Sequence, residues 1–145
     1  MNQKVFVIGS NSENLKPLRE KIRSFLKKTG LPVKTQEEIL VAICEGCTNS
    51  MRHAYLGKPG NEIRVTAQDR EGEVVLKIRD YGKKIDLSKV KTPELPSQKP
   101  GGLGIYFMKT IMDELQYNTT HPQGNELILV KYKKGNKKGE KGSTS

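Results

Sequence analysis

Three polar residues, Glu45, Asn49 and His53, recur every four residues along one stretch of the sequence. If this stretch is helical, their side chains form a row, because residues i and i+4 are neighbours on a helix surface. A carboxylate can orient or deprotonate a hydroxyl group, and a carboxamide oxygen is a ligand that Mg²⁺ accepts. A row of solvated polar residues is the alternative, and this stretch alone does not decide between the two.

Two further motifs supply partners for the row. Asp80-Tyr81-Gly82 follows the apolar run that begins at Val74, so a carboxylate and a glycine stand at the end of a predicted buried strand. The glycine-rich run 100–104 (PGGLG) precedes an amphipathic stretch, and the N-terminus of such a helix favours phosphate. Taken alone, that run also fits an ordinary flexible loop. Together the three motifs indicate a nucleotide site, and without a G-x-x-x-x-G-K-[ST] motif the phosphates must be held by other means.

The row lies in a predicted helix from Thr35 to Leu56. Thr35 and Glu38 form a capping-box pattern at its start, and Gly57, Pro59 and Gly60 are stop signals at its end. Small and apolar residues recur at three and four positions and predict a closely packed face, made of Ile39, Ala42, Ile43, Gly46, Cys47, Ser50 and Ala54.

The remaining elements follow from hydrophobic periodicity. We predict a strand at 5–8, a helix from the caps at 10–12 to Thr29, paired strands at 63–67 and 74–78, a polar lid from Lys83 to Gly104, a helix at 102–115, and strands at 117–120 and 127–132. This order predicts an α+β fold, a two-layer α/β sandwich in which three helices cover a mixed, mostly antiparallel sheet. One domain is expected over residues 1–134, followed by a disordered basic tail at 135–145.

Composition narrows the classes of partner. The net charge of +10 comes from 26 basic and 16 acidic residues, but no basic run is longer than two residues. A nucleic-acid partner is therefore disfavoured, and lysines of the lid near polyphosphate are a better use of the charge. No apolar run approaches the roughly 18 residues that a membrane span needs, and no signal-peptide pattern is present. A soluble, cytoplasmic protein without a membrane partner is expected.

Cys44 and Cys47 form a C-x-x-C motif. A zinc site needs two more ligands, for which His53 and His121 are the histidines available, and a redox pair normally lies at a helix N-terminus. Because both cysteines lie well inside the predicted helix, we interpret them as small buried hydrophobic residues in a reducing compartment.

At these motifs the sequence resembles a known family. CEGCTNSMRHAY resembles the asparagine box of the ATP-binding superfamily that includes gyrase, histidine kinases and mismatch-repair ATPases. RDYGKKID resembles its adenine-binding box, and KPGGLGIYFMKTIMDEL resembles its glycine box. The short chain, the E-x-x-x-N-x-x-x-H spacing and the MDE of the last box are similar to the anti-sigma-factor serine kinases of bacteria. The resemblance covers roughly Asn11 to Lys133.

The resemblance implies a Bergerat-type ATP-binding fold with ATP and Mg²⁺ as cofactors. It assigns the metal to Asn49, the adenine amino group to Asp80, and a catalytic role toward the attacking hydroxyl to Glu45. His53 extends the row and is interpreted as structural. The remaining cofactor-binding residues that it implies are Gly82, Ile85, Gly101, Gly102, Leu103 and Gly104.

The resemblance also implies partners and a reaction. The protein would bind a sigma factor and phosphorylate a serine of an anti-anti-sigma protein of the STAS type, and it would form a homodimer. The alternative is a non-catalytic, ATP-gated regulator with a different partner, while a detached histidine-kinase domain is disfavoured because no phospho-acceptor helix is present. Two residues depart from the family pattern: Lys84 replaces a glycine of the adenine box, and Asn125 follows Gly124 where a threonine is usual.

Overall fold

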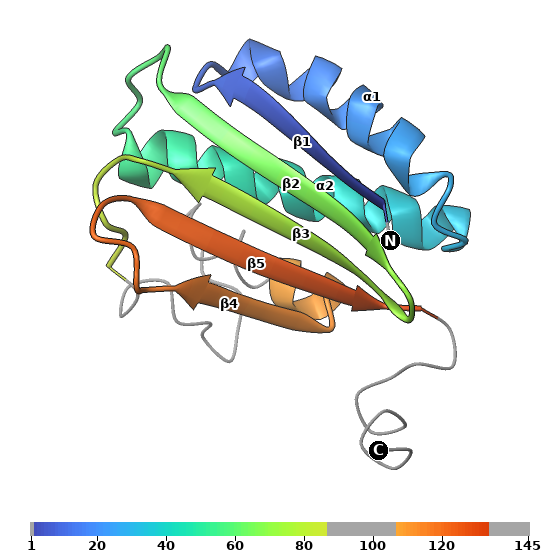
Figure 1. The fold of residues 1–145 in the computed structure, drawn as a ribbon. Helices are drawn as coiled ribbons and strands as arrows, with labels where there is room; N and C mark the ends of the chain where they lie inside the picture. Colours follow the sequence, from blue (N-terminus) through green and yellow to red (C-terminus); the bar gives the residue numbers. More distant parts are fainter. Residues whose placement is uncertain (1, 87–106, 134–145) are drawn as a thin grey trace.

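The computed structural model describes residues 2–86 and 107–133, which form a five-stranded sheet with helices packed on one face (Figure 1). The strand order is β1-β2-β3-β5-β4, and every neighbouring pair is antiparallel. The strands are β1 (Asn2–Gly9), β2 (Glu62–Arg70), β3 (Glu73–Asp80), β4 (Glu114–Asn118) and β5 (Asn125–Tyr132). The predicted α+β sandwich is confirmed, although these pairs make the described sheet antiparallel rather than mixed.

The helices on this face begin and end at slightly different residues from those predicted. A 3-10 turn, η1 (Ser12–Asn14), leads into α1 (Leu15–Leu26), so the first helix ends before Thr29. The central helix α2 (Val33–Asn49) continues into a π-helical turn, η2 (Ser50–Ala54). The capping box predicted at Thr35 is wrong. Pro32 is the N-cap residue, and no side chain caps the helix, since proline carries no side-chain acceptor for the first N–H groups.

The third helix ends earlier than predicted. Its described part covers residues 107–111, and β4 begins at Glu114, so Leu115 belongs to a strand rather than to the helix. Leu115 pairs with Leu129 of β5, and the Asp113 amide donates to the Val130 carbonyl at 2.9 Å. The apolar spacing of this segment fits either element, and pairing with β5 decides the outcome.

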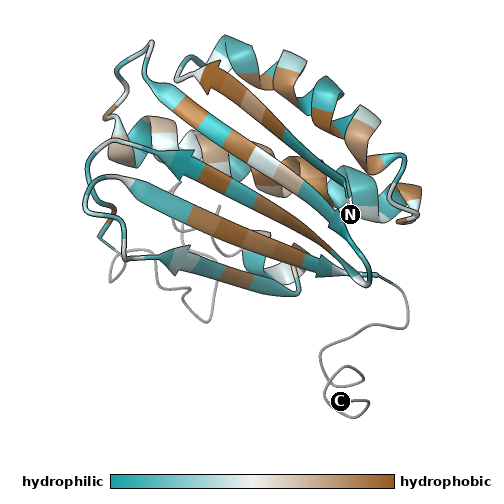
Figure 2. Ribbon diagram, in the orientation of Figure 1, coloured by the Kyte–Doolittle hydropathy of each residue, from teal (hydrophilic) through white to brown (hydrophobic). Residues whose placement is uncertain are grey.

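The core lies between the sheet and the helices. Alternate residues of β2, β3 and β5 face α1 and α2, which gives these strands the brown bands visible in Figure 2. The buried side chains that meet there include Leu18, Ile22, Ile39, Ile43, Ile63, Val65, Leu76, Ile78, Leu127 and Leu129. This packing holds α2 against the end of β3, where the candidate site lies.

Gly46 sets how closely α2 approaches the sheet. A Cβ atom at this position would lie 2.4 Å from Cδ1 of Ile78 and 3.1 Å from Cδ2 of Leu127. We expect Gly46→Ala to lower the free energy of unfolding by up to about 2 kcal/mol, because the cost of overpacking, about 1–3 kcal/mol, exceeds the roughly 1 kcal/mol that alanine gains over glycine in a helix. Denaturant unfolding measures the difference. Val41→Ala is the control, because Val41 is an exposed residue of the same helix and its truncation should change stability by less than about 0.5 kcal/mol. A variant more stable than the wild type by about 1 kcal/mol, the helix-propensity gain alone, would contradict the predicted close packing.

Candidate functional site

The carboxylate of Asp80 is the centre of the site. Asp80 is 0% exposed at the end of β3, directly opposite Asn125 in the sheet. Its Oδ1 accepts hydrogen bonds from the Gly82 amide (3.2 Å), the Asn125 amide (3.2 Å) and Nδ2 of Asn125 (2.9 Å). Among the described residues, Oδ2 accepts one hydrogen bond, from Oγ of Ser50 at 2.7 Å. Since each carboxylate oxygen has about two lone pairs, Oδ2 keeps acceptor capacity for an N–H group of a ligand.

The π-helical turn η2 brings α2 into contact with this carboxylate. The Tyr55 amide donates to the Ser50 carbonyl at 2.9 Å, five residues earlier, which widens the helix at its end. The wider turn places the Ser50 hydroxyl on Asp80 and the Ala54 carbonyl 2.8 Å from the Lys83 amide. Such turns within helices are frequent at functional sites.

The packing of the segment after β3 against η2 requires a glycine at position 82. A Cβ atom here would lie 2.5 Å from the Ala54 carbonyl oxygen and 2.8 Å from the Tyr55 ring. Only a residue without a side chain lets the segment after β3 pass so close to η2. Its predicted approach to a nucleobase stays a prediction.

Asn49 is the last residue of α2, one turn after the half-buried Glu45. Asn49 is 4% exposed, and its Nδ2 is buried; apart from a weak contact with the Tyr117 phenol, it has no hydrogen-bond partner among the described residues. The NH₂ group is a donor and cannot hold a cation, so the oxygen Oδ1 is the atom of this side chain that could ligate a metal. A carboxamide oxygen is a hard ligand suited to Mg²⁺, which takes its other oxygens from phosphates and water. The residues present therefore fit this metal.

Tyr117 of β4 lies beside Asn49 and was predicted only as a strand residue. Burial raises the pKa of Tyr117 to about 12, the Asp80 charge adds to the rise, and the Asn49 carboxamide opposes it. A raised pKa means that the neutral phenol stabilises the fold, and this contribution is lost as the pH rises from about 10 to about 12. We expect the absorbance titration of the wild type minus that of Tyr117→Phe to show one tyrosine ionising near pH 12. A difference titration centred near pH 10 would contradict this burial.

His53 lies beyond the regular part of the helix. It belongs to η2, where the pitch changes, so a spacing of four no longer fixes its direction. Burial and, to a smaller extent, the Arg52 charge hold the pKa of His53 below its ordinary value. Its Nε2 is buried without a hydrogen-bond partner among the described residues, so the structure assigns it no role toward Glu45 or Asn49.

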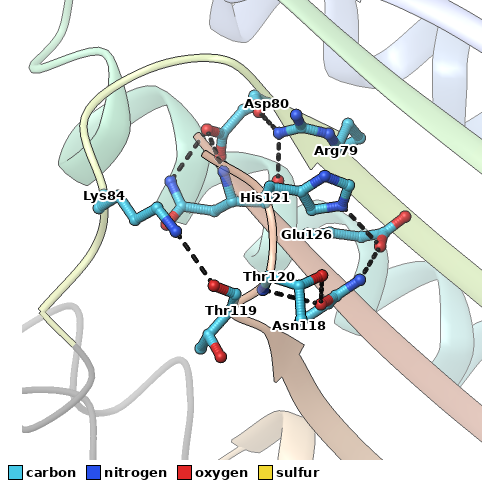
Figure 3. A network of polar contacts seen from close by, with 9 residues as sticks. Arg79, Asp80, Lys84, Asn118, Thr119, Thr120, His121 and Glu126 are labelled. Atoms are coloured by element: carbon cyan, nitrogen blue, oxygen red, sulfur yellow. Dashed lines mark hydrogen bonds and ion pairs between the residues drawn. The ribbon is translucent and has the colours of Figure 1, made fainter. Parts of the chain in front are cut away.

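The start of the predicted lid is held by the turn between β4 and β5. The Ile85 amide donates to Oδ1 of Asn125 at 2.8 Å, and Nζ of Lys84 donates to the Thr119 carbonyl at 3.2 Å. Figure 3 shows the hydrogen bond from Lys84 to Thr119 and, beside it, the contacts of Thr120 with Asn118 and of His121 with Glu126. The predicted phosphate-binding residues Gly101, Gly102, Leu103 and Gly104 lie outside the described residues.

The two cysteines are free thiols. Cys47 is fully buried in the core, where burial raises the pKa of its thiol, and Cys44 is half-buried. A thiol with a raised pKa is a poor nucleophile and metal ligand. Cys47 therefore packs as a hydrophobic residue.

This fold and site define the class of the protein. Residues 8–131 match the family described as the histidine kinase-like ATPase domain, and the chain belongs to that family. Its relatives include the serine-protein kinase RsbW of Oceanobacillus iheyensis, 29% identical over 72% of this chain and 70% of the relative. The anti-sigma F factor of a Clostridium botulinum strain is 29% identical over 84% of this chain and 88% of the relative. The resemblance to anti-sigma-factor serine kinases is thus confirmed.

Solved structures support the fold. The structure of the RsbU and RsbW domains of a Mycobacterium tuberculosis protein aligns with 91% of this chain, with a TM-score of 0.64 and 15% identity. The aligned part is 32% of the Mycobacterium tuberculosis chain. The histidine kinase domain of a blue-light-activated kinase from Erythrobacter litoralis matches 86% of this chain and 62% of its own, with a TM-score of 0.57 and 16% identity. Within residues 2–86 and 107–133, every helix is too short or too polar to cross a bilayer.

Proposed function

We propose that this protein is an ATP- and Mg²⁺-dependent protein serine kinase of the anti-sigma type. It binds a sigma factor and transfers the γ-phosphate of ATP to a serine of an anti-anti-sigma protein of the STAS type. The observation that carries the proposal is Asp80, a fully buried carboxylate held by four donors, whose Oδ2 accepts one hydrogen bond among the described residues and can accept a second. The relatives named serine-protein kinase RsbW and anti-sigma F factor support the choice of reaction and partners.

Adenine recognition follows from the acceptor at Asp80. The 6-amino group of adenine donates an N–H, and Oδ2 is the acceptor with remaining capacity. Because the Ser50 hydroxyl and three N–H groups already orient the carboxylate, the acceptor is in place before the base arrives. Ile85, half-buried in the following segment, would cover the base.

The transfer step requires positioning and charge stabilisation rather than covalent catalysis. Mg²⁺ supplies charge neutralisation on the phosphates, and Asn49 is the residue that would hold it. Glu45 lies one turn earlier on the same helix, where its carboxylate would orient the attacking serine hydroxyl and accept its proton. The predicted glycines 101, 102 and 104, with Leu103, would contact the phosphates through their backbone.

Phosphoryl transfer in a reconstituted mixture tests the proposal. The purified protein is incubated with γ-labelled ATP, Mg²⁺ and a STAS-type protein encoded near it in the genome. We expect the label on a serine of the STAS protein, located by mass spectrometry, and its loss when Mg²⁺ is chelated. A parallel binding assay with sigma factors tests the partner. ATP binding without any transfer would contradict the kinase proposal and favour the non-catalytic, ATP-gated regulator.

A further inference from the structure

The side chain of Asn125 bridges Asp80 and the first residues of the predicted lid. Its Nδ2 donates to Oδ1 of Asp80 and to the Lys83 carbonyl, each at 2.9 Å. Its Oδ1 accepts from the Ile85 amide at 2.8 Å. Both N–H groups and one oxygen lone pair of the carboxamide are therefore used, and the side chain is 7% exposed. One side chain thus contacts both the candidate base acceptor and the chain beyond it.

The hydrogen bonds fix the carboxamide in one orientation. A flipped amide would direct its oxygen at the Asp80 carboxylate and the Lys83 carbonyl, and its NH₂ group at the Ile85 amide. Three hydrogen bonds would become three repulsive contacts.

The backbone around Asn125 is fixed as well. Its amide donates to Asp80, and Nη1 of Arg79 donates to its carbonyl at 3.3 Å. Gly124 precedes it with φ +77°, and a Cβ atom there would lie 2.1 Å from the Asp80 carbonyl oxygen. The carboxamide therefore has little freedom to absorb a movement at either end of the bridge.

We propose that Asn125 is a positioning residue that couples nucleobase binding at Asp80 to the conformation of the segment 83–86. The proposal rests on the nucleotide-binding function proposed above. A base that donates to Oδ2 restrains the carboxylate further, and Nδ2 of Asn125, shared between Asp80 and the Lys83 carbonyl, extends this restraint to Lys83 and Ile85. A threonine at this position has one O–H donor on a shorter side chain and cannot make all three hydrogen bonds.

Amide hydrogen exchange at Ile85 tests the coupling, measured by NMR with and without ADP and Mg²⁺. We expect ADP to slow Ile85 exchange in the wild type but not in Asn125→Thr. Without ADP, Ile85 should exchange at least about ten-fold faster in Asn125→Thr, because a hydrogen bond of roughly 1.4 kcal/mol is lost. Asn125→Ala removes the acceptor and both donors, so Ile85 should exchange as fast as in Asn125→Thr and should show no response to ADP.

Gln123→Ala is the matched control. Two residues before Asn125, Nε2 of Gln123 donates to the Tyr81 carbonyl at 2.8 Å, just ahead of the segment 83–86 and without a hydrogen bond to Asp80. The response of Ile85 to ADP should persist in this variant. Exchange at Leu76 in β3 shows that each variant is folded.

The outcomes separate the coupling from the function on which it rests. If ADP binds and slows Ile85 exchange equally in the wild type and both Asn125 variants, the coupling is wrong and the nucleotide site stands. If the wild type binds neither ADP nor ATP, the proposed function is wrong and the coupling fails with it.

Discussion

Replacing Glu45 with glutamine is expected to slow phosphoryl transfer by about 10²–10⁴-fold, the usual range for a positioned general base. Glutamine keeps the size of the side chain and removes its ability to accept a proton. Because Glu45 lies one turn from Asn49 rather than beside Asp80, ATP affinity should stay within about ten-fold, or roughly 1.4 kcal/mol. Single-turnover transfer from labelled ATP, together with calorimetry of ATP binding, separates the two effects.

Two further variants, Asn49→Ala and Glu38→Gln, are compared with Glu45→Gln in the same assays. Asn49→Ala removes the proposed metal ligand, so Mg²⁺-dependent nucleotide binding should weaken and transfer should be lost in the same variant. Glu38→Gln makes the same change of charge on α2 more than one turn before Glu45, and transfer should be unchanged. Transfer at the wild-type rate in Glu45→Gln would remove Glu45 as the base while leaving the kinase proposal intact.

The sequence was sufficient to predict the fold class and the position of Asp80. Alternating apolar residues in β2 and β3 specify which strand face is buried, and this alternation places Asp80 on the buried face at the end of β3. The apolar and small residues of α2 specify its face toward the sheet, including Gly46, where a Cβ atom would meet Ile78. These features depend on local periodicity, which a sequence displays directly.

The features that the sequence did not predict depend on contacts between distant segments. Ser50 was interpreted as part of a small packing face, yet its hydroxyl binds Asp80, which lies 30 residues further along the chain. The π-helical turn that directs it there is stabilised by contacts of Ala54 with Lys83, which no local pattern encodes. The hydrogen bonds of Asn125 could not be predicted from the sequence either, because its partners lie in β3 and in the loop that follows β3.

Asp80→Asn is expected to weaken ATP binding by about 1.5–3 kcal/mol, or roughly 10–150-fold, the value of a hydrogen bond to a charged group. The three N–H donors around Oδ1 fix the orientation of the new carboxamide, because its oxygen must occupy the position of Oδ1 to accept their hydrogen bonds. Its NH₂ group then takes the position of Oδ2 and faces the adenine amino group, donor against donor. Isothermal calorimetry measures the loss for ATP.

The same orientation predicts a change of base preference, which a simple loss of stability would not produce. Inosine triphosphate carries an acceptor oxygen at position 6 in place of the amino group, so it should bind Asp80→Asn at least as tightly as it binds the wild type. Ser50→Ala removes the other donor to Oδ2 and leaves the acceptor in place, so this variant should keep the preference for ATP. Unchanged ATP affinity in Asp80→Asn would exclude Asp80 from base recognition. A uniform loss for both nucleotides would instead assign Asp80 to the stability of the pocket.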